Sequence, residues 1–275
     1  MDPTPKSKGQ AAGTYYDANY GNFQTKLYSE IRREAFGDDI GQNSWLTAEE
    51  QDLFLSWLDL SAGKTLLDVA CGSGGPALRI AASTGCSVVG IDLHEQAIAT
   101  AKALASQRNL REHAEFCVVN AGEQLPFPDM RFDAIICVDA VNHLPNRPRV
   151  LAEWARLLKP GGRLLFTDPA TVTGPLTNEE IAVRSSAGFF LFVPGDYDKE
   201  VIAQSGLQLL ECKDATANMA TVAEKRRAAR ESRSAAVRQI EGDQRYEAQQ
   251  NFLAMTARLA GEGRLSRLAY LSEKI

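Results

Sequence analysis

Two aspartates stand where consecutive apolar runs of the chain end, and a glycine-rich loop lies between them. Asp68 comes near the end of the run 65–70, Asp92 ends the run 87–92, and Gly72-Ser-Gly-Gly75 follows the first run. Glycines at such a position let the backbone approach a ligand closely and leave the N–H groups of a following helix facing it. The pattern predicts a cofactor site at the ends of two strands.

The glycine spacing alone leaves two kinds of cofactor open. Gly72-x-Gly74-x-x-Ala77 satisfies the spacing of dinucleotide-binding loops, with Asp92 about 20 residues further on. A dinucleotide would place its pyrophosphate over this loop, where the carboxylate of Asp68 would repel it. S-adenosylmethionine carries an ammonium and a sulfonium but no phosphate. The acidic residue at position 68 therefore favours S-adenosylmethionine over NAD.

One of the three histidines, His143, follows the fourth predicted strand at the same edge of the sheet. An imidazole, with a pKa near ~6.5, can take a proton from a hydroxyl at neutral pH. Asp168 ends the fifth predicted strand and is a candidate to orient that imidazole or to bind the acceptor. The alternative interpretation is a histidine that only packs beneath the cofactor. His94 and His113 are expected at the surface.

Aromatic residues are candidates for the acceptor side of the site. The segment 184–195 is rich in aromatics and glycine, and within it Phe189 could wall an apolar pocket while Arg184 could pair with an anionic acceptor. The alternatives are a buried helix for Phe189 and a surface salt bridge for Arg184. Three tyrosines near the N-terminus are expected to close the site: Tyr15, Tyr16 and Tyr20.

From residue 64 onward, short apolar runs alternate with helical stretches, which is typical of a parallel α/β sheet. Seven strands are predicted: 65–70, 87–92, 115–119, 134–138, 163–167, 207–213 and 267–272. Helices are predicted over about 76–84, 95–108 and 147–158, with the run Lys159-Pro-Gly-Gly162 ending the last of them.

We divide the chain into five parts: a disordered leader (1–13), an N-terminal helical cap (14–61), a cofactor-binding core (62–213), a helical insertion (214–262) and a last core strand (263–275). An insertion of that length inside a compact domain commonly covers a site, so we expect a lid. The alternative is a helical pair that only packs on the sheet.

Composition limits the class of protein. The 275 residues are 44% hydrophobic and carry a net charge of −5, which argues for a globular chain and against a nucleic-acid binder. No apolar run is long enough for a membrane span. Five cysteines without a C-x-x-C pair predict neither a disulfide framework nor a metal site and favour the cytoplasm. We expect a monomer or a homodimer.

Five motifs, in order over about residues 62–170, resemble those of class I S-adenosylmethionine-dependent methyltransferases. They are Asp68-Val-Ala-Cys-Gly-Ser-Gly-Gly75, Gly90-Ile-Asp92, Asn120-Ala121 followed by Leu125-Pro-Phe-Pro128, Arg131-Phe-Asp133, and Leu157-Leu-Lys-Pro-Gly-Gly162. Tyr15-Tyr-Asp-Ala-Asn-Tyr20 is similar to the small-molecule branch of that family. The resemblance implies a Rossmann-like, seven-stranded sheet of order 3-2-1-4-5-7-6, flanked by helices, with the seventh strand antiparallel.

The resemblance also implies a set of cofactor contacts. The methionine end would lie against Asp68 and the backbone of Ala70, Gly72 and Gly74. The adenosine would lie with its ribose on Asp92 and its adenine on Leu93, Asn120 and Ala121, and Val138 would lie near the sulfonium.

The function implied is transfer of a methyl group to a small, partly apolar metabolite, with a hydroxyl oxygen as the favoured acceptor and His143 as its general base. Attack by a neutral amine would need no strong base, so an N-methyltransferase is the alternative. An NAD(P)-dependent oxidoreductase and a non-catalytic cofactor-binding protein are the remaining alternatives. The products expected are a methylated small molecule and S-adenosylhomocysteine.

Overall fold

The computed structural model describes residues 20–186 and 188–275. The predicted leader over 1–13 and the candidate residues Tyr15 and Tyr16 lie outside the described residues.

An eight-stranded sheet forms the centre of the described chain and confirms the predicted α/β class. Its strands are β1 (Thr65–Val69), β2 (Ser87–Asp92), β3 (Ala114–Val118), β4 (Phe132–Cys137), β5 (Leu158–Val172), β6 (Val193–Pro194), β7 (Leu207–Asp214) and β8 (Leu265–Lys274). The main path runs β3-β2-β1-β4-β5-β8-β7, with the short β6 beside β5. Because β6 was not predicted, β7 and β8 are the predicted sixth and seventh strands, and the predicted order is confirmed. β8 is antiparallel to both neighbours.

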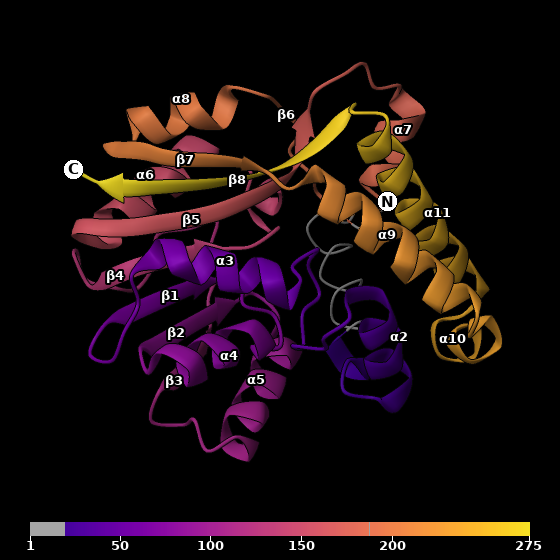
Figure 1. The fold of residues 1–275 in the computed structure, drawn as a ribbon, viewed down its shortest axis with the longest axis horizontal. Helices are drawn as coiled ribbons and strands as arrows, with labels where there is room; N and C mark the ends of the chain where they lie inside the picture. Colours follow the sequence, from indigo (N-terminus) through magenta and orange to yellow (C-terminus); the bar gives the residue numbers. More distant parts are fainter. Residues whose placement is uncertain (1–19, 187) are drawn as a thin grey trace, which may run out of the picture.

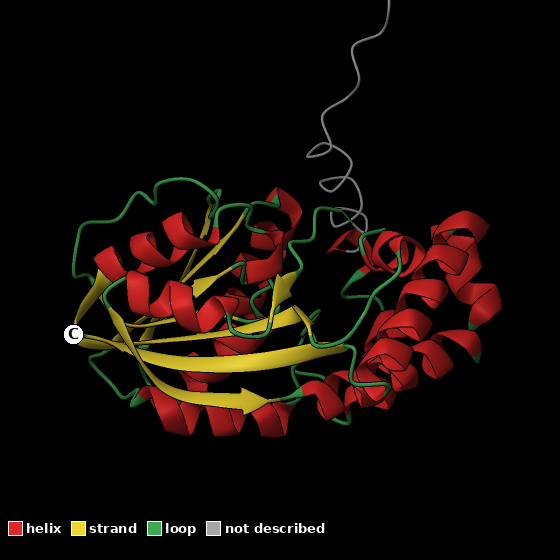
Figure 2. Ribbon diagram, turned by 90° about the horizontal axis from the view of Figure 1, so that it is seen from above, coloured by secondary structure: helices red, strands yellow, loops and turns green. Residues whose placement is uncertain are grey.

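Helices cover both faces of the sheet (Figure 2). On one face lie α3 (Ala48–Leu58), α4 (Gly75–Thr84) and α5 (Glu95–Gln107), and on the other α6 (Arg147–Leu157) and α8 (Tyr197–Gln204). Successive side chains of a strand point to opposite faces. In β1, Leu67 and Val69 therefore pack toward α6, while Leu66 packs toward α3 and α4, and Asp68 shares that second face.

Four more helices pack together beside the carboxyl ends of the parallel strands (Figure 1). They are α2 (Lys26–Phe36), α9 (Thr216–Glu231), α10 (Ser234–Glu241) and α11 (Asp243–Gly261). Their shared core includes Phe36, Met219 and Leu253, together with Trp45 from the loop before α3. The chain between β7 and β8 is thus helical, as predicted. Within the described ranges, every helix is too short or too polar to traverse a bilayer.

The fifth strand is much longer than the predicted 163–167, for two reasons. Residues 159–162, predicted as a turn, bulge out of the ladder, since Phe132 pairs with Leu158 and Ala134 already pairs with Arg163. Gly161 permits this with a φ of +72°. Beyond position 167, Pro169 cannot donate to the ladder and lies at a register shift, after which β5 resumes pairing with β8 and β6.

Candidate active site

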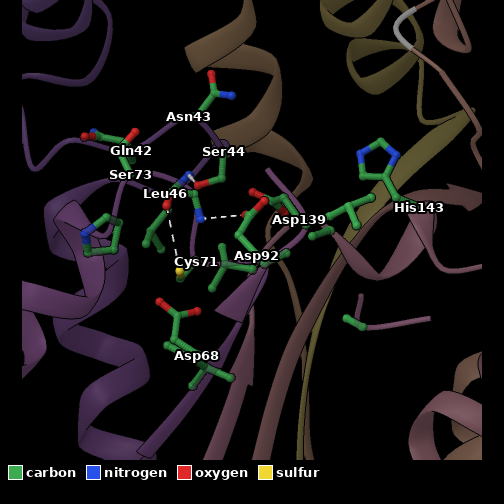
Figure 3. Close-up of a pocket in the computed structure, with 18 of the residues that line it drawn as sticks. Gln42, Asn43, Ser44, Leu46, Asp68, Cys71, Ser73, Asp92, Asp139 and His143 are labelled. Atoms are coloured by element: carbon green, nitrogen blue, oxygen red, sulfur yellow. Dashed lines mark hydrogen bonds between the residues drawn. The ribbon is translucent and has the colours of Figure 1, made fainter. Parts of the chain in front are cut away.

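A cavity of about 360 Å³ lies at the carboxyl ends of β1, β2 and β4 (Figure 3). Its wall includes most of the predicted cofactor-binding residues: Asp68, Ala70, Gly72, Asp92, Leu93, Asn120, Ala121 and Val138. Gly74 is not among the described residues that line the cavity. A Cβ at Gly74 would lie 2.7 Å from the Cβ of Ala101, so that glycine permits the close packing of α4 against α5, and its predicted backbone contact with the cofactor stays a prediction.

The glycine loop turns sharply between β1 and α4 (Gly75–Thr84). Ala70 has a φ of +59° and Gly72 one of +55°, so both adopt the left-handed conformation, which is strained for alanine. The Gly72 N–H donates to the carboxylate of Asp92 over 2.9 Å. A Cβ at Gly72 would lie 3.0 Å from the hydroxyl of Tyr20, which packs onto the loop from the N-terminal side. The loop thus exposes backbone, with little side chain, to the cavity.

Two buried carboxylates face this loop. Asp68 is 5% exposed and Asp92 is 6% exposed. Asp92 accepts the backbone N–H groups of Gly72 and His94, both over 2.9 Å, whereas no described residue donates a hydrogen bond to the side chain of Asp68. Burial, and to a lesser extent the nearby charge of Asp92, raises the pKa of Asp68 to about 8. Such a carboxylate suits a ligand that brings positive charge.

His143 lies in a short 3₁₀ turn (Val141–His143) after β4, on the side of the cavity opposite Gln42 in Figure 3. Its Nδ1 is 2.8 Å from the backbone oxygen of Phe189, and its ring meets that of Phe190 edge-on at 4.6 Å. A carbonyl oxygen can only accept, so Nδ1 carries the hydrogen and Nε2 is the basic nitrogen of the neutral ring. Burial lowers the pKa of His143, an effect opposed by the hydrogen bond to Phe189 and assisted by the charge of Arg184.

Asp168 of β5 belongs to a buried ion cluster. Its side chain is fully buried and accepts hydrogen bonds from Arg147 over 3.0 Å and from the backbone N–H of Ala170 over 2.8 Å. Arg147 also binds Asp198 of α8, on the sheet face away from α3. The described cavity wall does not include Asp168. The structure thus places Asp168 in a buried ion cluster, from which its charge raises the pKa of His143 against the effect of burial. Its predicted role as the group that orients the imidazole stays a prediction.

The predicted acceptor residues separate into two groups. Tyr20 and Phe189 line the cavity, and Phe189 is 45% exposed. Arg184, at the end of α7 (Asn178–Arg184), is 1% exposed and stacks on Phe252 at 4.5 Å, so it is neither at the surface nor on the cavity wall among the described residues. Its predicted contact with an anionic acceptor is corrected to a packing role.

Part of the wall was not predicted. We call residues 41–46 the wall segment, because five of its six residues line the cavity: Gly41, Gln42, Asn43, Ser44 and Leu46. Ser73 and Asp139 also line it. The wall segment is a loop without periodicity or motif, so no local signal could have found it. Asp139 comes directly after the predicted strand 134–138, and Asp68 and Asp92 also lie at or near predicted strand ends, so that signal was available.

Comparison with known proteins assigns the family. A family model described as a methyltransferase domain matches residues 67–166. Methyltransferase GfsG of Streptomyces halstedii is 30% identical over 222 residues, which cover 74% of this chain and 78% of that protein. The chain belongs to the class I S-adenosylmethionine-dependent methyltransferases. S-adenosylmethionine is accordingly its methyl donor, and the acidic, glycine-lined cavity fits that cationic cofactor.

Other relatives of this methyltransferase differ in what their names say they act on. The 27-O-demethylrifamycin SV methyltransferase of Amycolatopsis mediterranei is 33% identical over 183 residues, or 66% of this chain, and the chain spans 65% of that protein's length. Among solved structures, the cyclopropane synthase MmaA2 of Mycobacterium tuberculosis matches with a TM-score of 0.80 over the full length of both chains, at 21% identity. The structural likeness concerns the fold.

Proposed function

We propose that this methyltransferase methylates a hydroxyl oxygen of a small, partly apolar molecule, with His143 as the general base. The observation that carries the proposal is the hydrogen bond of His143 Nδ1 to the Phe189 carbonyl, which makes Nε2 the proton acceptor. The lowered pKa of His143 keeps the ring neutral near pH 7 and so ready to accept. The cofactor supplies a methyl group activated by its sulfonium.

The cavity wall suggests how the chain would hold the cofactor. Asp68 would attract the ammonium group, and Asp92 would accept the ribose hydroxyls while it keeps the Gly72 N–H. Leu93 is 58% exposed although it is large and apolar, and an adenine ring packed on it would remove that surface from water. Asn120 and Ala121 would then border the adenine, and Val138 would lie near the sulfonium.

The acceptor would enter on the side of His143 and Phe189. The exposed ring of Phe189 offers an apolar contact, and Tyr20 would close the opposite side. The helices α2, α9 and α11 would form the lid, since they pack beside the strand ends at which the cavity opens. Oxygen as the acceptor is supported by two relatives named as O-methylating enzymes, the rifamycin methyltransferase and resE of Aspergillus sclerotiorum, which is 30% identical over 167 residues.

The test is a screen of small hydroxylated molecules for release of S-adenosylhomocysteine, followed by kinetics of His143→Gln. We expect kcat to fall by about 10²–10⁴, the usual contribution of a general base, while the Kd for S-adenosylhomocysteine stays within about twofold. Turnover at the wild-type level would reject the base role and favour an amine acceptor, which attacks without deprotonation. Binding of the cofactor without turnover of any hydroxyl or amine would favour a non-catalytic role.

A further inference from the structure

A buried ion network joins the wall segment to the sheet. Arg267 of β8 is fully buried, and its Nε donates to Asp139 Oδ1 over 2.6 Å while its Nη1 donates to both oxygens of Glu50 at 2.7 and 2.8 Å. Glu50 belongs to α3, immediately after the wall segment. Thr167 of β5 also donates to Asp139 Oδ1, over 2.7 Å, so Asp139 is fixed from two neighbouring strands.

The second oxygen of Asp139 reaches the wall segment itself. Asp139 Oδ2 accepts the backbone N–H of Trp45 over 2.8 Å, and the backbone oxygen of Trp45 accepts from the side chain of Asn218 in α9 over 3.1 Å. The indole of Trp45 points into the helical core, where it stacks on Phe252 at 6.3 Å with an interplanar angle of 12°. Side chains thus hold both backbone groups of Trp45. Asp139, which follows β4, holds the N–H, and Asn218 of α9 holds the carbonyl oxygen.

We propose that Asp139 is a positioning residue that holds the wall segment against the cofactor cavity. Asp139 lines the cavity and stands four residues before His143. Its backbone adopts a left-handed φ of +54°, which is strained for a residue other than glycine. A backbone strained in this way persists only where its surroundings determine it. The network would therefore set the closed position of the wall segment and thereby slow the escape of bound cofactor or product. This inference rests on the proposed placement of the cofactor in the cavity.

Asp139→Asn tests the proposal, because the amide has the same shape but only one accepting oxygen. At least one of the donors that now meet the carboxylate would face an N–H. We expect hydrogen exchange at the Trp45 amide, measured by mass spectrometry on peptides covering 40–46, to become at least about tenfold faster. We expect S-adenosylhomocysteine to dissociate about tenfold faster in stopped-flow displacement. Asn218→Ala, which removes the contact to the Trp45 oxygen and a hydrogen bond to Glu50 but leaves Asp139 intact, should give smaller changes of the same sign.

Asp198→Asn is the matched control, since Asp198 is also a buried aspartate bound to a fully buried arginine, Arg147, but lies away from the cavity wall. It should lower the melting temperature without changing either rate. The proposal is overturned if neither rate changes in Asp139→Asn and Asn218→Ala, if Asp198→Asn accelerates both rates equally, or if exchange accelerates while release does not. Failure of the wild type to bind S-adenosylhomocysteine would instead refute the proposed cofactor site, and the exchange measurement would still decide whether Asp139 holds the wall segment.

Discussion

The pH dependence of cofactor binding should report the ionisation of Asp68. In the ligand-free protein, burial and then the charge of Asp92 raise the pKa of Asp68 to about 8, so about nine in ten of these carboxyls are protonated at pH 7. An ammonium group bound beside it favours the ionised form, because opposite charges lower the pKa of an acid. Binding must therefore release a proton, and affinity must rise with pH.

The magnitude follows from the size of the shift. Each pH unit below 8 costs about 1.4 kcal/mol to ionise Asp68, which is about tenfold in Kd. We expect the Kd for S-adenosylhomocysteine to fall about 50-fold from pH 6 to pH 8 and to level off above pH 8. At pH 7 about 0.9 protons should leave per ligand bound. Isothermal titration in two buffers with different heats of ionisation measures both quantities.

Asp68→Asn is the control, since it cannot ionise but keeps the size of the side chain. This variant should bind S-adenosylhomocysteine more weakly than the wild type at pH 8, with a Kd nearly independent of pH between 6 and 8. That result would separate the effect of Asp68 on binding from any effect of His94 and His143. Loss of a proton from the ligand's own ammonium would weaken binding as pH rises and so has the opposite sign. A wild-type Kd that is constant from pH 6 to pH 8, without proton release, would refute the reasoning.

Two further predictions concern strand β2 and the acceptor side. Gly90→Ala should lower the free energy of unfolding in urea by about 1–3 kcal/mol. The new Cβ would lie 2.5 Å from Phe116 Cδ1 and 2.9 Å from Cys71 Sγ. Unchanged stability would mean that β3, which carries Phe116, can move away. Phe189→Ala should raise the KM for the acceptor by about tenfold, because roughly half of the ring's apolar surface is available to a ligand. The Kd for S-adenosylhomocysteine should stay within about twofold of the wild-type value. An equal rise in KM and Kd would place Phe189 in the cofactor site instead.

The sheet could be predicted because strands buried on both faces are continuous apolar runs that helical patterns separate. β2 (Ser87–Asp92) begins and ends where predicted, since its run ends at the Asp92 turn. β6 could not be predicted, because Val193 and Pro194 form a strand only through their pairing with the far end of β5. The order of the strands came from the family resemblance, since apolar runs do not specify neighbours.

The cofactor side of the cavity was accessible to sequence reasoning because its residues follow strand ends inside local motifs. The wall segment was not, because the contacts of Trp45 and Glu50 that help to hold Gln42, Asn43 and Ser44 at the cavity come from distant parts of the chain. Those contacts link positions about a hundred or more residues apart, and nothing in either local sequence indicates the other.

Asp139 and Asp168 differ in the face of the sheet toward which they point. Both follow strand ends at the same edge of the sheet, and only Asp168 was chosen as a site residue. In β5, however, Leu164 and Phe166 pack toward α6, and Asp168 continues on their face toward Arg147, whereas Leu165 and Thr167 face the cavity side. A shift of one residue along a strand changes the face on which a side chain lies. Alternation from Leu164 onward would have excluded Asp168 from the cavity side, and the Thr167 hydroxyl, on the opposite face, is what binds Asp139 at the cavity wall.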